Sequence, residues 1–354
     1  MAILDRNEHR NQIPARLGEI GKLTPDTVFG ELSRRNIMAL GASAGIGLGL
    51  GSISTSALAK AAKLHVQAPY WYRFNVGEAE ITVVSDGWQM LGDPSNSFLG
   101  VPKDEVRKEL TDNFMSPSDM NIELNSFVVN SNGKMVLFDT GLGASKMFGP
   151  KGGLLAKSLS DAGIRREDID AVVISHGHID HIGGIVDESG ALMYPNAQVY
   201  MSQADFDYWT DERQMDSPWK KAFIIHARKN LLPVRDRLIF FKDEQEFLPG
   251  ITAIAAPGHT LGHTMFNVQS NGQSFFFVGD VSHHSVLLIE NPRMEFLYDT
   301  DAKQAVKTRL KMLSFLAENR IPILAYHFAW PGYGHFVKQG EGFRYLPAAM
   351  NMNL

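Results

Sequence analysis

The sequence predicts an α+β fold in which two β-sheets pack face to face and helices cover them on the outside. From Pro69 onward, segments typical of strands come first in each half of the chain, and helix-like segments follow. No linker rich in Pro, Gly or Ser interrupts this stretch, so we expect a single domain. Clusters of His and Asp stand directly after several predicted strands, where ligand-bearing loops collect.

The predicted elements follow from alternation, apolar runs and turn residues. Gly77-Glu78 and Asn132-Gly133 indicate two tight hairpins. One helix is predicted over 152–162, ending at Gly163, and a longer one over 300–318. The predicted strands cover residues 72–76, 80–85, 125–129, 134–139, 170–175, 198–201, 251–255, 265–269, 274–278 and 322–326.

The composition limits the chemistry. The chain has 354 residues and a formal net charge of −5, which disfavours a nucleic-acid partner, since such proteins are usually basic. It contains no Cys, so disulfides, thiolate metal ligands and Cys nucleophiles are excluded. A transition-metal site must therefore use His, Asp, Glu and water.

The first 61 residues resemble a twin-arginine export signal followed by a flexible segment. Arg34-Arg35 precede an uncharged stretch, 36–59, that is rich in Gly, Ala and Ser and ends in Ala57-Leu58-Ala59, a cleavable pattern. We expect export to the periplasm or outside the cell by the twin-arginine machinery, with residues 62–354 as the functional domain. A membrane anchor and a cytoplasmic amphipathic helix are the alternatives.

The central motif follows the strand predicted at 170–175 and reads His176-Gly177-His178-Ile179-Asp180-His181. Two His residues at i and i+2 on a tight loop can face one cation, and the next Asp and His then turn toward a second point. Imidazole and carboxylate are ligands for zinc, iron or manganese. The alternative interpretation of this motif is that Asp180 caps a helix and that the His residues are ordinary surface residues.

Three further motifs also follow predicted strands. They are Pro257-Gly258-His259-Thr260-Leu261-Gly262-His263, Gly279-Asp280, and the segment from Tyr326-His327 to His335. Taken singly, the last two are weak signals, because Gly-Asp is usually a turn and a lone His is usually structural. Their shared position after strands makes a common site the better interpretation.

In order and spacing, these motifs resemble the metallo-β-lactamase superfamily over residues 72–346. The resemblance implies an αββα sandwich of two mixed sheets with helices outside. It implies that His176, His178 and His259 hold one metal, that Asp180, His181 and His327 hold another, and that Asp280 bridges both. Asp139 would support the metal loop, and His263 and His335 would lie near it.

Within the superfamily, the sequence most resembles methyl parathion hydrolase and its lactonase-like relatives. This likeness is carried by Tyr72-Arg73 through Ser85-Asp86-Gly87, by Phe148-Gly149-Pro150, by 258–263 and by Phe328-Ala329-Trp330-Pro331-Gly332-Tyr333-Gly334. The implied cofactors are two divalent ions, zinc above all, with Fe, Mn or Co as alternatives. They would share a hydroxide that attacks an ester, lactone or phosphotriester. Asp280, Asp180 and His263 are the expected catalytic residues.

A substrate pocket is expected to include Phe148, Tyr208, Trp209, Phe223, His283, His284 and Trp330. Acyl-homoserine lactonases carry a Tyr shortly after the bridging Asp, and this chain has His283 and His284 there instead. Either His could protonate the leaving group. The expected partner is a small molecule with an apolar, aryl or acyl group. The sequence does not decide whether the protein forms a homodimer.

Other functions remain open on the sequence alone. A glyoxalase-type thioesterase and a β-lactamase would use a similar metal set. The same fold also hosts non-haem iron redox proteins, and a non-catalytic metal-binding module is the alternative of another class.

Overall fold

The computed structural model describes Lys63 and residues 67–351. The export signal expected over residues 1–61 therefore lies outside the described residues. Residues Val66–Leu354 form one compact unit, which contains the expected metal-binding motifs. Within the described ranges, no helix is long and apolar enough to cross a membrane.

The first sheet has seven strands in the order β1-β2-β4-β5-β6-β7-β8. Neighbours are antiparallel from β1 to β5 and parallel from β5 to β8, so the sheet is mixed. Its strands are β1 (Trp71–Val76), β2 (Ala79–Gly92), β4 (Met120–Ser131), β5 (Lys134–Phe138), β6 (Ala171–Val173), β7 (Gln198–Ser202) and β8 (Leu238–Phe241).

The second sheet also has seven strands, in the order β16-β15-β14-β12-β11-β10-β9, with one parallel pair, β12 and β14. Its strands are β9 (Glu246–Leu248), β10 (Ile251–Ala255), β11 (Thr264–Ser270), β12 (Gln273–Phe277), β14 (Ile323–Leu324), β15 (Tyr333–Gln339) and β16 (Gly342–Pro347). A small separate sheet pairs β3 (Phe98–Leu99) with β13 (Glu295–Phe296).

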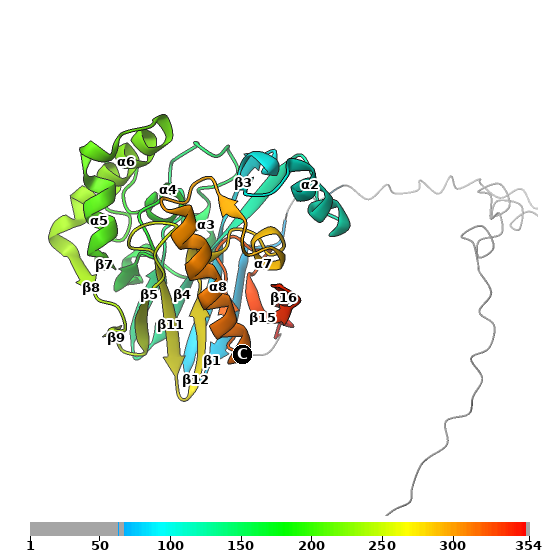
Figure 1. Ribbon diagram of the computed structural model, residues 1–354. Helices are drawn as coiled ribbons and strands as arrows, with labels where there is room; N and C mark the ends of the chain where they lie inside the picture. The colour runs from blue at the N-terminus through cyan, green and yellow to red at the C-terminus, as the bar shows by residue number, and fades with distance from the viewer. Residues whose placement is uncertain (1–62, 64–66, 352–354) are drawn as a thin grey trace, which may run out of the picture. The chain divides into compact units, whose positions relative to one another are not determined.

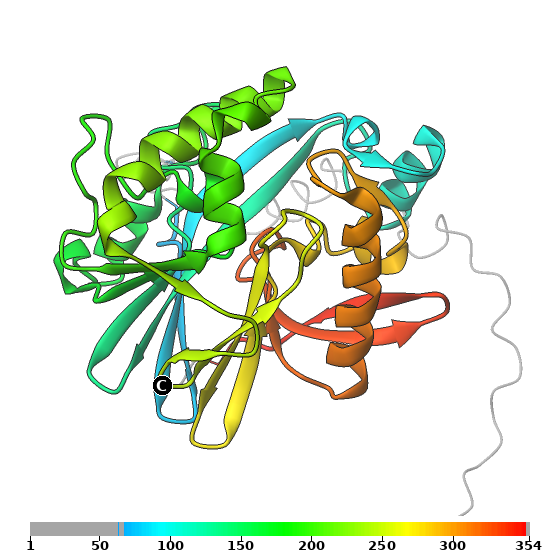
Figure 2. The ribbon, with the colours of Figure 1, turned by 60° about the vertical axis from the view of Figure 1, so that its left-hand side comes forward.

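The helices flank these sheets. In Figure 1, α8 (orange) runs alongside β11 and β12, while α5 and α6 (green) stand apart from it beside β7 and β8; Figure 2 shows the same separation from another side. The α-helices are α2 (Lys103–Asp112), α3 (Leu155–Asp161), α4 (Ile179–Ile182), α5 (Gln203–Thr210), α6 (Pro218–Leu231), α7 (Leu287–Glu290) and α8 (Ala302–Glu318).

The core lies between the two sheets and is rich in Phe. Phe127 of β4 stacks on Phe138 of β5 at 4.3 Å between ring centroids, and Phe277 of β12 meets Phe127 edge-on at 5.0 Å. Phe266 of β11 meets Phe138 at 5.4 Å. All four rings are fully buried, so the facing sheets are held together by aromatic packing.

The predicted αββα sandwich is confirmed. Both predicted hairpin turns are present, and Asn132 and Gly133 adopt φ values of 52° and 71°, the left-handed conformation that such a turn needs. The first predicted helix is shorter than expected, because 152–154 form the loop before α3. The edge strands β8, β9 and β16 and the neighbouring strand β15 were not predicted, since half-exposed strands carry a weak apolar pattern.

Candidate metal centre

Loops at the carboxyl ends of β6, β10, β12 and β14 meet at one edge of the sandwich. The loop after β6 carries the first His motif, and those after β10 and β12 carry His259 and Asp280. The loop after β14 carries His327. Two glycines allow the backbone of these loops to pass close to neighbouring groups. Gly279 has a φ of 49°, and a Cβ there would lie 2.7 Å from His263 Nε2; Gly258 has a φ of 134°, and its Cβ would strike the backbone of Ala305.

Among the described residues, the predicted ligand atoms gather in four overlapping groups, two of which include Asp280. The ligand atoms within each group lie within 4.8 Å of one another, and all belong to buried residues. The groups are His176-His178-His259 and His176-His181-Asp280 on one side, and Asp180-His181-His327 on the other, with a further group of His259, Asp280 and His283.

Asp280 is the centre of the arrangement. Its Oδ2 lies 3.2 Å from His259 Nε2, 3.3 Å from His327 Nε2 and 3.6 Å from His176 Nε2. His327 Nε2 also lies 3.5 Å from Asp180 Oδ2, so the two halves of the predicted ligand set form one cluster.

The cluster fits divalent metal ions. The Nε2 atoms of His176, His178, His181 and His259 are buried, and none has a hydrogen-bond partner in the described part of the chain. Four buried imidazole nitrogens without partners are costly unless something else binds them. Their convergence with two carboxylates supplies the all-nitrogen-and-oxygen donor set that zinc and similar ions accept.

The opposite nitrogen of several of these rings is held by the protein. His181 Nδ1 lies 2.8 Å from Asp139 Oδ2, and His327 Nδ1 lies 2.9 Å from the carbonyl oxygen of Glu123. His259 Nδ1 lies 2.8 Å from Asp299 Oδ1. Acceptors at Nδ1 place the proton there and leave Nε2 free to bind a metal, as in other carboxylate–histidine–metal arrangements. Asp139 thus occupies the supporting position that the family resemblance implies for it.

Asp205 joins the two His loops. Its buried carboxylate accepts hydrogen bonds from Gly177 N–H at 2.7 Å, from Gly262 N–H at 2.6 Å and from the Thr260 hydroxyl at 2.8 Å. It stands on α5, far in sequence from both loops. The carboxylate therefore fixes the spacing between the first motif and the loop that carries His259.

A buried arginine supports the same side. The Arg309 guanidinium of α8 is 1% exposed and donates to the carbonyl oxygens of Val281 at 2.8 Å and Met294 at 2.6 Å. Its Nη2 lies 3.7 Å from Asp299 Oδ2, the carboxylate that holds His259. Arg309 thus ties the loop after Asp280 to the segment that orients His259.

The charges of the cluster suit a bound cation. Burial lowers the pKa of His176 and His178 well below the ordinary value, so both rings are neutral and free to act as ligands. Burial opposes ionisation of Asp280, but the surrounding imidazoles of His181 and His327 hold its pKa well below its usual range. Against the effect of burial, the carboxylates beside His181 and His259 act in the other direction: they raise the pKa of His181 well above its usual range and that of His259 to about 9, so a bound metal would take the place of a proton on these two rings.

The cavity over the cluster is narrow and aromatic. It measures about 20 Å³, little more than the room that one water needs. Of the predicted pocket residues, the structure brings Phe148, Phe223 and His283 to it. The full lining is Gln89, Phe148, His178, Asp180, Phe223, His259, Asp280, His283, Phe296, Tyr298 and His327.

The other four predicted pocket residues do not line this cavity. Trp209 is fully buried behind His178, with ring centroids 4.7 Å apart, and Tyr208 packs next to it. Trp330 packs edge-on against Tyr70. His284 Nδ1 accepts from the backbone N–H groups that follow it, and its ring lines a neighbouring cavity that reaches His327 from another side. These four side chains therefore lie outside the lining of the cavity over the metal cluster.

Two more His residues have structural roles. His263, expected to be catalytic, accepts a hydrogen bond from Asp280 N–H at its Nε2 (2.9 Å) and donates from Nδ1 to the carbonyl oxygen of Ala256 (3.1 Å). Both nitrogens are used within the protein, so His263 positions Asp280. His335, expected near the site, lies on β15 and lines a separate cavity with Arg320.

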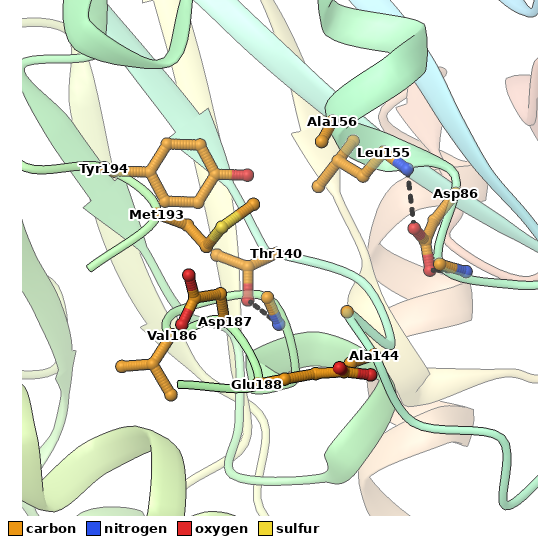
Figure 3. Close-up of a pocket in the computed structure, with 13 residues that line it drawn as sticks. Asp86, Thr140, Ala144, Leu155, Ala156, Val186, Asp187, Glu188, Met193 and Tyr194 are labelled. Carbon is orange, nitrogen blue, oxygen red and sulfur yellow. Dashed lines mark hydrogen bonds between the residues drawn. The ribbon is translucent and has the colours of Figure 1, made fainter. Parts of the chain in front are cut away.

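A larger cavity lies elsewhere. It measures about 240 Å³, and Figure 3 shows it lined by Thr140, Tyr194 and neighbouring residues, with the Leu155 N–H bonded to the Asp86 carboxylate. No residue of the metal cluster is among the described residues that line it. Thr140 donates to the carbonyl oxygen of His181, so this cavity adjoins the back of the metal loop.

A family model, that of the metallo-β-lactamase superfamily, matches residues 124–322, more than half of the chain. The chain belongs to the metallo-β-lactamase superfamily. The structure is similar to that of AidC, a dizinc quorum-quenching lactonase in complex with the product N-hexanoyl-L-homoserine. The two share 29% identity and a TM-score of 0.75, over 80% of this chain and 98% of AidC.

It is also similar to the hydrolase AbOPH, with 27% identity and a TM-score of 0.74 over 81% of this chain and 100% of that one. Among curated proteins, the lactamase-like protein ptaB of Pestalotiopsis fici is 26% identical over 47% of this chain and 42% of its own length. The chain spans less than half the length of the curated relatives it matches.

Some site residues escaped the sequence analysis. Asp205, Asp299 and Arg309 lie on elements without a ligand motif, and their roles depend on tertiary contacts. Gln89 stands on β2, Phe296 on β13 and Tyr298 just after β13, all outside the His motifs. Asp299 lies three residues before α8, whose N-cap is Asp301, so the sequence there indicates only the start of a helix.

Proposed function

We propose that this chain is a dinuclear metal hydrolase of lactones and related carboxylic esters. The observation that carries the proposal is the buried cluster of ligand atoms centred on Asp280, in which the Nε2 atoms of four imidazoles have no hydrogen-bond partner in the described chain. Two metal ions, zinc first among them, would be held by His176, His178, His259, Asp180, His181 and His327, with Asp280 shared. The likeness to a dizinc lactonase supports the lactone over other substrates.

When bound, the two ions supply Lewis-acid activation of water and of the scissile carbonyl at neutral pH. The protein's own contribution is orientation. Asp139, Asp299 and the Glu123 carbonyl hold the imidazoles in one tautomer, and His263 holds the Asp280 backbone. Because the cluster is buried, its charges act in a low dielectric, where they stabilise developing negative charge strongly.

His283 stands where a leaving group can meet it. Its Nε2 lies 3.0 Å from Asp280 Oδ2, its Nδ1 has no partner in the described chain, and its ring stacks on Phe296 at 3.9 Å. Burial lowers the pKa of His283 to about 3, so the ring is neutral at pH 7 and carries one N–H. With this proton on Nδ1, the N–H would donate a hydrogen bond to the developing alkoxide oxygen as the lactone opens, and the alkoxide would then take its proton from water.

The aromatic rings over the cluster favour an acyl or aryl group. Phe148, Phe223 and Tyr298 lie with ring centroids about 6 Å apart, and Tyr298 is stacked on Phe223. The cavity has room for about one water, so these rings must part to admit a substrate. Such walls offer apolar contact and no charge, which disfavours polyanionic substrates such as nucleic acids.

A panel assay of the zinc-loaded protein tests the proposal. Its substrates are an N-acyl-homoserine lactone, an aryl ester, methyl parathion, nitrocefin and a glutathione thioester. We expect the lactone to have the highest kcat/KM and the charged thioester the lowest. Fastest turnover of nitrocefin or of the thioester would replace the proposal by a β-lactamase or a glyoxalase-type enzyme. No turnover of any substrate would favour a redox or metal-binding role.

We also propose that the chain is exported by the twin-arginine route, on the evidence of Arg34-Arg35 and the uncharged stretch 36–59. That route carries folded proteins, so the metal centre could form before export. Replacing Arg34 and Arg35 together by Lys should retain the protein in the cytoplasm, as measured by cell fractionation. Unchanged periplasmic recovery of the double variant would contradict export by this route.

A further inference from the structure

We infer that Gln89 recognises a secondary amide in the substrate, which makes N-acylamino lactones or esters the preferred class. The inference rests on the proposed function. Gln89 lines the same cavity as Asp180, Asp280 and His283 and is 5% exposed. Its Oε1 is buried and has no hydrogen-bond partner among the described residues.

The Oε1 atom of this carboxamide makes no hydrogen bond to the described part of the chain. Asn230 is fully paired by contrast: its Oδ1 accepts from Val186 N–H, and its amino group donates to the carbonyl oxygen of His226. The buried Oδ1 atoms of Asn125 and Asn267 also lack partners in the described chain, but neither residue lines the cavity over the metal cluster. Gln89 instead keeps a desolvated acceptor at a cavity wall, which is unfavourable until a donor arrives. A site that tolerates such an unpaired group in the free protein is expected to pair it when the substrate binds.

The backbone fixes Gln89 relative to the metal cluster. Gln89 pairs with Ile122 across β2 and β4, and the neighbouring pair is Trp88 with Glu123. The carbonyl oxygen of Glu123 is the acceptor for His327 Nδ1 at 2.9 Å. One sheet register therefore sets both the orientation of a predicted metal ligand and the position of the Gln89 amide. This is the rigid support that a specificity contact needs.

The chemistry of the amide selects the partner. The unpaired Oε1 of Gln89 requires a donor, and the N–H of a secondary amide supplies one. Apart from Gln89 and His283, the lining residues outside the predicted ligand set are Phe148, Phe223, Phe296 and Tyr298, whose rings suit an acyl chain. Methyl parathion and simple aryl esters carry no donor, so they would leave Oε1 unpaired.

The test compares two lactones that differ in the amide. One is N-hexanoyl-L-homoserine lactone, and the other is an α-alkyl-γ-butyrolactone of matched length, which lacks the amide. In Gln89→Met, which keeps the size of the side chain and removes its polarity, we expect kcat/KM for the amide lactone to fall by about 10- to 100-fold. The kcat/KM for the alkyl lactone should stay level or rise.

The ratio of the two rates is an internal control for folding, since a damaged protein loses both activities together. Gln269→Met, an exposed position on β11, is the matched control and should change neither rate. Equal changes for both lactones in Gln89→Met, or no change for either, would overturn the inference and leave the proposed function standing. If the wild type hydrolyses neither lactone, the proposed function fails and the inference falls with it.

Discussion

Replacing Asp205 by Asn tests whether one buried carboxylate holds the two His loops together. The carboxylate lies outside the ligand set and touches neither the cavity nor the ligand nitrogens. Its contacts are Gly177 N–H and the Thr260 hydroxyl at Oδ2 and Gly262 N–H at Oδ1. The substitution keeps the shape of the side chain and exchanges one acceptor for an amino group.

The magnitude follows from these three bonds. If the remaining oxygen takes the Oδ2 position, two bonds persist without charge assistance and the Gly262 N–H faces a second donor. One unsatisfied buried donor costs about 1–3 kcal/mol, and hydrogen bonds to a charged group are stronger than neutral ones. Burial raises the pKa of Asp205, which means that the charged carboxylate is costly to desolvate. The neutral amide of Asn avoids part of this cost, which offsets some of the lost hydrogen-bond energy. We expect the free energy of unfolding of the metal-free protein to fall by about 2 kcal/mol.

Zinc affinity should fall as well, by about 10- to 100-fold, because supporting contacts of this kind orient the ligands. Urea unfolding of the metal-free protein and zinc titration against a competing chelator measure the two effects. Asp207→Asn, an exposed position on the same helix, should change neither quantity. An Asp205→Asn protein with wild-type stability and wild-type zinc affinity would refute the role assigned to this carboxylate.

Three further outcomes are expected. Asp280→Asn keeps its shape but loses the charge at the centre of the cluster, so kcat should fall at least ~100-fold while KM moves far less; a folded variant with two zinc ions and near wild-type kcat would contradict this. His283→Asn should slow lactone hydrolysis at least ~10-fold more than hydrolysis of a 4-nitrophenyl ester, whose leaving group needs no proton; equal losses would exclude a role at the leaving oxygen. Hydrogen bonds from Ser95 and then Arg107 lower the pKa of Asp93 from 3.8 to about 2, so its stabilising effect is present above pH 4 and is lost as the pH falls toward 2. Acid unfolding of Asp93→Asn should therefore differ from the wild type near pH 4 and converge with it near pH 2, and a difference that grows toward pH 2 would be inconsistent with this linkage.

The clustering of the His and Asp side chains could be predicted from the sequence because each of them follows a short apolar strand within a compact motif, whereas their assignment as metal ligands came from the family resemblance and stays a prediction. His176 through His181 occupy six consecutive positions, and Gly279-Asp280 ends a strand of three consecutive Phe residues. The carboxyl ends of these strands meet at one edge of the sandwich. Residues that directly follow the strands are therefore close together in space.

The pocket could not be predicted in the same way. Trp209 and Trp330 have the composition of pocket residues, yet Trp209 packs behind a ligand and Trp330 against Tyr70. Gln89 faces the cavity, although nothing in its strand distinguishes it from a surface residue. Tertiary packing decides which side of a strand faces a cavity. The pairing of β2 shifts register between Ser85 and Trp88, so the alternation of side chains before this shift does not predict the direction of Gln89 after it.

Titration of the metal-free protein with zinc, with bound zinc and lactone hydrolysis followed in the same samples, tests the central claim most directly. The cluster around Asp280 predicts two zinc ions per chain and hydrolysis of N-hexanoyl-L-homoserine lactone that reaches its full rate only when the second ion is bound. Full hydrolysis with one zinc per chain, or two bound zinc ions without lactone hydrolysis, would contradict the account.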